Sequence, residues 1–156
     1  MGTFIGTEPN FITTLKKLIE LDSAVSEAYG AVIEHLKNDS YRNKLTEFKR
    51  DHEQHMKELS ELLIQQGQTL PKGPFAQKWL TKSKVLLATF MGDKMMLTAM
   101  RSNELETHKA YEKAMHHPRK LPSSDMILKG GLEDEKYHQE WIEQTLTQDF
   151  FAESVD

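Results

Sequence analysis

The chain has 156 residues, enough for one domain with a hydrophobic core of ordinary size. Charged residues make up 28% of it and the net charge is −4, with acids and bases interleaved, so we expect no nucleic-acid partner and no polybasic membrane contact. Cysteine is absent, which excludes disulfides, thiolate metal sites, a cysteine nucleophile and a rubredoxin-type iron centre within this chain.

The first ten residues, MGTFIGTEPN, lack the basic and apolar regions of a secretory signal. No apolar run approaches the roughly 18 residues that a membrane span requires. A soluble cytoplasmic protein is therefore the simplest expectation.

Turn and capping residues divide the rest of the chain into four long segments with helical spacing. These segments are expected at about residues 10–37, 40–66, 93–115 and 123–148. Residues 74–91 also show helical spacing, so a short extra helix is expected in the connection between the second and third helices. Strand alternation is absent. The pattern predicts an all-α four-helix bundle forming a single domain at residues 10–148, with tails at 1–9 and 149–156.

Ionisable side chains interrupt the apolar stripe of each long helix. In chain order they are Asp22, His52, His55, Glu104, Glu135 and His138. An isolated charge in an apolar core costs several kcal/mol, so such groups persist only when they are paired, neutralised or bound to a metal. Residues three apart on a helix point the same way, so His52 with His55, and Glu135 with His138, could each hold an ion.

The chain also shows weak internal similarity between its two halves. Acids, tyrosines and the residues of two x-x-His segments recur at nearly constant separations. The matched pairs are Asp22 with Glu104 and Tyr29 with Tyr111, each 82 residues apart, and His52 with Glu135 and His55 with His138, each 83 apart. We interpret the repeat as a pseudo-twofold arrangement of two helix pairs.

Four strings carry a resemblance that extends over nearly the whole chain: LIELDSAVSEAY, EQHMKEL, KGPFAQKWLTKSKVLLATFMGD and ELETHKAYEKAM. In this order and spacing they resemble the ferritin-like superfamily, and within it the small bacterial four-helix-bundle domains classed as a domain of unknown function. The resemblance implies an antiparallel bundle, a long connection between the second and third helices, and a metal centre between the helices.

Carried over residue by residue, the superfamily's ligand pattern falls on Asp22, His55, Glu104, Glu135 and His138. His52 departs from it, since the superfamily has at this position a glutamate whose carboxylate bridges two metals. Three histidines and three carboxylates could hold two ions with Glu135 as the only bridge, or a single ion. This donor set suits iron, with zinc and manganese as alternatives, at one or two ions per chain; copper and nickel also accept imidazole ligands.

Other residues have a structural and a functional interpretation. Tyr29 and Tyr111 could donate hydrogen bonds to the ligands or simply pack in the bundle. His108 could be an extra ligand, but an exposed partner of a residue one turn away is the simpler interpretation. His116 and His117 are expected to cap the third helix, and the methionines from 91 to 100 are expected to pack rather than bind metal.

Two functional hypotheses follow. The first is a metal-binding bundle that handles iron, dioxygen or peroxide; if it is an enzyme, it is an oxidoreductase that needs an external electron donor, because the chain encodes no electron-transfer centre. The second is a non-catalytic scaffold or partner-binding protein whose histidines and carboxylates form a structural polar layer. A homodimer is compatible with both hypotheses, since Phe75 and Trp79 could meet a second subunit.

Overall fold

Four long helices make up most of the chain in the computed structural model, which describes residues 5–6, 8–73 and 91–155, with side chains as far as residue 148. They are α1 (Phe11–His35), α2 (Asp39–Gln65), α5 (Asp93–Met115) and α6 (Asp125–Val155), and the turn η1 (Pro122–Ser124) precedes α6. The described ranges contain no strand. The predicted all-α four-helix bundle is confirmed.

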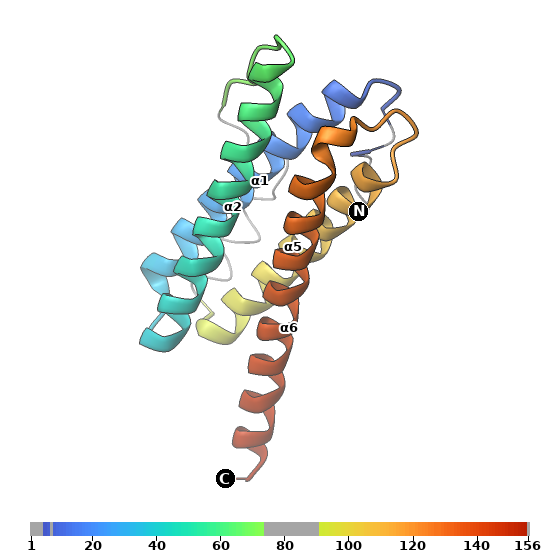
Figure 1. Cartoon of the computed structure of the whole chain (residues 1–156). Coiled ribbons are helices and arrows are strands. Elements are labelled where there is room, and N and C mark those ends of the chain that lie inside the picture. The colour runs from blue at the N-terminus through green and yellow to red at the C-terminus, as the bar shows by residue number, and fades with distance from the viewer. Residues whose placement is uncertain (1–4, 7, 74–90, 156) are drawn as a thin grey trace.

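Neighbouring helices run antiparallel (Figure 1). The most extensive packing is between α1 and α2 and between α5 and α6, and these two pairs then pack against each other. α2 ends at one end of the bundle and α5 begins near the opposite end, so the two helix ends that the connection joins lie a bundle length apart (Figure 1). The expected long connection is therefore present. The short helix predicted within it, at 74–91, lies outside the described residues except for residue 91.

Capping residues set the helix ends close to the predicted ones. Asn10 accepts a hydrogen bond from the backbone N–H of Ile12 at 2.8 Å and starts α1. Asn38 starts α2 in the same way, because its side chain accepts a hydrogen bond from the backbone N–H of Tyr41 at 3.1 Å. Gly67 follows α2 with a φ of 69°, a conformation that glycine adopts without steric cost.

The fourth helix differs from its predicted bounds at both ends. It begins at Asp125 because residues 122–124 form a separate 3₁₀ turn, and it continues to Val155, beyond the predicted end at Gln148. Residues 149–155 read DFFAESV and contain no glycine or proline, so nothing in them terminates a helix. The predicted end at residue 148 was therefore too early.

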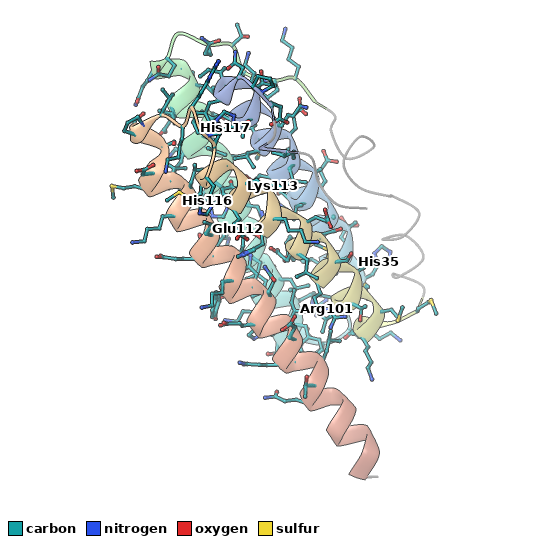
Figure 2. The ribbon with its side chains drawn as sticks, turned by 90° about the vertical axis from the view of Figure 1, so that its right-hand side faces the viewer. His35, Arg101, Glu112, Lys113, His116 and His117 are labelled. Atoms are coloured by element: carbon teal, nitrogen blue, oxygen red, sulfur yellow. The ribbon has the colours of Figure 1, made fainter. Side chains whose placement is uncertain are left out.

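The N-terminal segment packs against the bundle before α1 begins. Ile5 is 1% exposed and belongs to the hydrophobic core. Gly6 has a φ of 97° and approaches α5 so closely that a Cβ would lie 2.4 Å from Cβ of Lys113, which Figure 2 labels near the end of that helix. Only glycine fits this contact, which holds Ile5 in the core.

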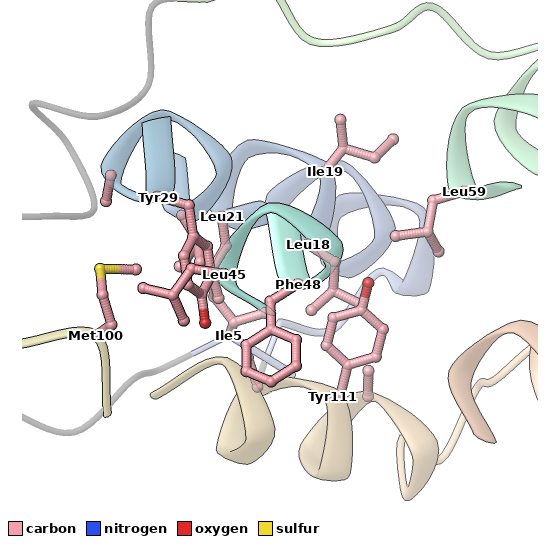
Figure 3. Close-up of a cluster of buried hydrophobic side chains, with 14 of the residues drawn as sticks. Ile5, Leu18, Ile19, Leu21, Tyr29, Leu45, Phe48, Leu59, Met100 and Tyr111 are labelled. Atoms are coloured by element: carbon pink, nitrogen blue, oxygen red, sulfur yellow. The ribbon is translucent and has the colours of Figure 1, made fainter. Parts of the chain in front are cut away.

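Aromatic side chains fill the middle of the bundle (Figure 3). Tyr29 from α1, Phe48 from α2 and Tyr111 from α5 are each 0% exposed. Phe48 stacks on the imidazole of His138 with ring centroids 4.1 Å apart, and it packs edge-to-face with Trp141 with centroids 5.7 Å apart. These rings form a rigid apolar frame around the polar groups that interrupt the core.

Two adjacent glycines of α6 give a matched test of this packing. A Cβ at Gly130 would meet nothing within 4 Å, so Gly130→Ala should stabilise the protein by about 0.5–1 kcal/mol through helix propensity. A Cβ at Gly131 would lie 2.5 Å from Cε1 of Tyr111, so Gly131→Ala should destabilise it by about 1–3 kcal/mol through overpacking. Denaturant unfolding of both variants measures the difference. Equal stabilisation by both would show that the Tyr111 ring is free to move.

Candidate metal centre

All six residues predicted as metal ligands meet at the middle of the bundle, and none is more than 3% exposed. They form two groups whose ligand atoms lie within 4.8 Å of one another. The first group is Asp22, His52, His55 and Glu135, and the second is His52, Glu104, Glu135 and His138. His52 and Glu135 belong to both groups, so the two groups overlap.

The first group has the spacing of donors around one ion. Nδ1 of His52 lies 2.9 Å from Oδ1 of Asp22 and 3.6 Å from Oε1 of Glu135. Nδ1 of His55 lies 3.7 Å and 3.8 Å from the same two oxygens. Tetrahedral donors with bonds of about 2.0–2.1 Å to one ion are about 3.3 Å apart, so these separations suit a single cation.

The second group is arranged in the same way on the other side of His52. Nε2 of His52 lies 2.9 Å from Oε1 of Glu104. Nδ1 of His138 lies 3.3 Å from the same oxygen. Glu135 completes the group from α6. Each half of the sequence repeat therefore contributes ligands to both groups.

Two further carboxylates, which the sequence analysis did not predict, orient His55 and His138, called here the outer histidines. Nε2 of His55 hydrogen-bonds Oδ2 of Asp134, and Nε2 of His138 hydrogen-bonds Oδ2 of Asp51, each at 2.8 Å. An imidazole that donates from Nε2 keeps its Nδ1 lone pair free to bind a cation, as ligand histidines commonly do. The sequence does carry a signal for them, since an aspartate stands four residues before the last histidine in both DHEQH and DEKYH.

The two tyrosines of the repeat donate hydrogen bonds across the halves. Tyr29 donates to Oε1 of Glu104, and Tyr111 donates to Oδ2 of Asp22. Burial, with the adjacent carboxylate as the next cause, raises the pKa of each phenol well above its usual value, so both keep their protons. They therefore orient the carboxylates, in addition to packing in the core.

Without an ion, a proton on His52 balances the carboxylates. Burial lowers the pKa of His52, but the charge of Glu104 and the hydrogen bond to Asp22 outweigh it and raise the pKa to about 10. Burial would raise the pKa of Glu104, but the positive His52 holds it well below its ordinary value. Burial and the neighbouring Glu104 raise the pKa of Glu135 well above the ordinary range, so Glu135 holds a proton more readily than an exposed glutamate does.

Several polar atoms that face this centre have no hydrogen-bond partner among the described residues. They are both carboxylate oxygens of Glu135, Oε2 of Glu104, and Nδ1 of His55 and His138. Leaving a buried polar atom unsatisfied costs about 1–3 kcal/mol, so five in one place is an unusual cost. All five are atoms that could ligate a cation, so the residues present fit one or two bound metal ions.

These pKa shifts predict how the metal-free protein responds to pH. The pKa values of His52 and His55 are raised from 6.5 to about 10 and about 9, so their contribution to stability is fully present below pH 6.5 and is lost as the pH rises through 9 to 10. The melting temperature of protein treated with a chelator should therefore fall between pH 7 and pH 10. The melting temperature of the double variant His52→Gln with His55→Gln should fall less over the same pH range. An equal fall would contradict the assignment of the raised pKa values to these two histidines.

The other histidines lie outside the two groups. Nε2 of His108 is 3.6 Å from Oε2 of Glu112, the expected contact one turn away. His116 bonds the carbonyl of Glu112 at 2.8 Å at the end of α5 (Figure 2). His117 joins two segments instead of simply capping: its Nε2 donates to the carbonyl of Glu8 at 2.5 Å and its Nδ1 accepts from the backbone of Arg119.

The methionines that precede and begin α5 divide between surface and core. Met91 and Met95 are 66% and 40% exposed, whereas Met96 and Met100 are at most 1% exposed and pack in the core. None of the four belongs to either ligand group, in which all donors are nitrogen or oxygen atoms.

The fold and the site together define a class: an all-α four-helix bundle with two overlapping buried groups of histidines and carboxylates that could hold metal ions. A family described as "Domain of unknown function (DUF2383)" matches residues 10–117, and the chain belongs to this family. The match covers α1, α2 and α5, whereas Glu135 and His138 lie beyond it. Comparisons with curated proteins and with solved structures gave no significant match.

Within the described residues, no helix is long and apolar enough to cross a membrane.

Proposed function

We propose that this protein is a ferritin-like metal-binding bundle that holds two metal ions, with iron as the first candidate, and that it handles iron or oxidants. The observation that carries the proposal is the pair of overlapping ligand groups, together with five buried donor atoms that have no partner among the described residues. Mixed imidazole and carboxylate donors suit iron, and they keep zinc and manganese as alternatives.

Each of the two groups would hold one of the two ions. Asp22 and His55 would hold one ion, Glu104 and His138 would hold the other, and His52 and Glu135 lie between them. Bound iron would supply one-electron redox chemistry toward dioxygen or peroxide. The surrounding apolar frame would keep bulk water away from the site.

Asp51 and Asp134 could accept protons that leave the buried centre. Side chains of Asp134 and Asp51 are 46% and 40% exposed, while the histidines they contact are nearly fully buried. A proton on Nε2 of His55 or His138 is thus one hydrogen bond away from a carboxylate that meets solvent. An external reductant would have to provide electrons for turnover, since the chain has no cysteine to hold an iron–sulfur or rubredoxin-type centre.

Iron loading followed by peroxide tests the proposed chemistry. Anaerobic protein with bound Fe(II) should show a rise in near-ultraviolet absorbance on addition of peroxide, because oxidised iron absorbs there. Glu135→Gln should abolish the change, while Glu133→Gln, an exposed acid on the same helix, should leave it intact. Iron that binds without any spectral change would contradict oxidant handling and leave storage or sensing as the role.

A structural polar layer is the second candidate, and one observation favours it. His52 already bonds Asp22 and Glu104 directly at 2.9 Å without an ion, so it could fix the register of three helices by itself. In that case the protein would take up no metal. It would also melt at the same temperature with and without metal in the buffer, which separates the two candidates.

A further inference from the structure

His52 differs from the other two histidines of the centre in how its ring is placed. Its side chain is 0% exposed and both ring nitrogens face carboxylates of the site. Nδ1 is 2.9 Å from Asp22 in the first group, and Nε2 is 2.9 Å from Glu104 in the second. One ring therefore presents one nitrogen to each group.

The outer histidines cannot do this. His55 and His138 each turn Nε2 outward to an aspartate at 2.8 Å, which leaves only Nδ1 for the site. His52 has no such outward partner among the described residues, because both of its hydrogen bonds go to predicted ligands. In the internal repeat His52 is matched with Glu135, the carboxylate that both groups share.

We propose that His52 holds both metal ions at once as a bridging imidazolate, with one ion on Nδ1 and the other on Nε2. The proposal rests on the proposed function, in which the centre takes two ions. As the second ion binds, the remaining ring N–H bond breaks, its electron pair forms the metal–nitrogen bond, and the proton passes to the buffer. No oxidation or reduction is involved.

The charges of the donor set favour this state. Asp22, Glu104 and Glu135 supply three negative charges when all are ionised, whereas two divalent cations carry four positive charges. An imidazolate at His52 adds the fourth negative charge and makes the two ions with their six buried ligands neutral, the half-exposed Asp51 and Asp134 lying outside this set. Because an uncompensated buried charge costs several kcal/mol, neutrality favours the deprotonated ring.

The bridge also predicts the distance between the ions. With metal–nitrogen bonds of about 2.0–2.1 Å on opposite sides of the ring, the two ions should lie about 6 Å apart. Ions joined by a small bridge in ordinary two-metal sites are closer, about 3.5–4 Å apart. A measured separation therefore distinguishes bridging by His52 from bridging by Glu135 alone.

A crystal structure of the full chain loaded with Zn(II), with anomalous differences collected at the zinc edge, gives this distance. We expect two zinc peaks about 6 Å apart, one in line with each nitrogen of His52. Two peaks about 3.5–4 Å apart, or a His52 ring that contacts one ion only, would overturn the bridge but leave the proposed function standing. Protein that takes up no zinc would overturn both.

Copper supplies an independent measurement in solution. Two Cu(II) ions on one imidazolate couple antiferromagnetically, so wild-type protein with two bound equivalents should show less than half of the EPR signal of two isolated ions. His52→Gln should bind at most one Cu(II), with its full signal, while His108→Gln, outside both groups, should behave as wild type. A full two-ion signal from wild type would overturn the bridge.

A carboxylate variant guards against simple loss of folding. His52→Glu places at position 52 the same residue type as Glu135, its match in the internal repeat. This variant should therefore still bind two Zn(II) ions. Their separation should shorten by about 2 Å relative to wild type, as expected for a small bridge in place of an imidazole ring. An unchanged separation in this variant would contradict a bridging role for the His52 ring.

Discussion

Glu135→Gln should remove both metal ions, because Glu135 is the one carboxylate shared by the two ligand groups. Glutamine keeps the shape of the side chain but binds a cation much more weakly than a carboxylate does. Metal analysis of the purified variant should give less than a tenth of the wild-type content. Isothermal titration with Zn(II) should show no high-affinity binding.

The same substitution should leave the metal-free fold intact. Burial and Glu104 raise the pKa of Glu135, which favours its neutral form without an ion, and glutamine resembles that form. Metal-stripped Glu135→Gln should therefore melt within a few degrees of metal-stripped wild type. Glu133→Gln is the matched control and should keep both ions. Full metal content in Glu135→Gln would refute the shared-ligand geometry.

Asp51→Asn and Asp134→Asn should each weaken a different ion. Asp134 orients His55 of the first group, whereas Asp51 orients His138 of the second. Loss of a carboxylate behind a ligand histidine typically lowers metal affinity about 10- to 100-fold, and each variant should show this loss at one ion while the other ion keeps its affinity. Competition with a chromophoric chelator resolves the two dissociation constants.

The double variant of these two aspartates gives the control for that experiment. Because the histidines lie on opposite sides of His52, the two losses should appear at both ions together and add with little interaction. If both single variants weakened the same ion, the assignment of one aspartate to each ion would be wrong. If neither weakened any ion, the aspartates would serve only as surface ion pairs.

The helices and the six central residues follow from patterns within single segments. An acid such as Asp22 in an otherwise apolar stripe is visible in sequence, because the 3.6-residue period assigns it to the buried face. The same reasoning applied to His52 and Glu104, which the structure buries completely. The burial of these ligand types could thus be predicted without knowing how the helices pack.

The outer hydrogen bonds could not be predicted in this way. Asp51 and Asp134 stand on half-exposed positions of their own helices and meet a histidine of another helix. Their partners depend on the register between α2 and α6, which no single-helix pattern determines. The direction of the His52 ring is likewise a property of packing, so the sequence marked it as a departure without indicating that both nitrogens face ligands.

Metal content of the full chain, expressed and purified without a His-tag, distinguishes a two-metal centre from a structural polar layer. Protein from cells grown with added iron, or refilled with Fe(II) anaerobically, should contain two metal equivalents per chain by elemental analysis and melt at higher temperature than the stripped protein. Protein that stays metal-free in both preparations, with an unchanged melting temperature, would contradict a two-metal centre and leave a structural polar layer in the middle of the bundle.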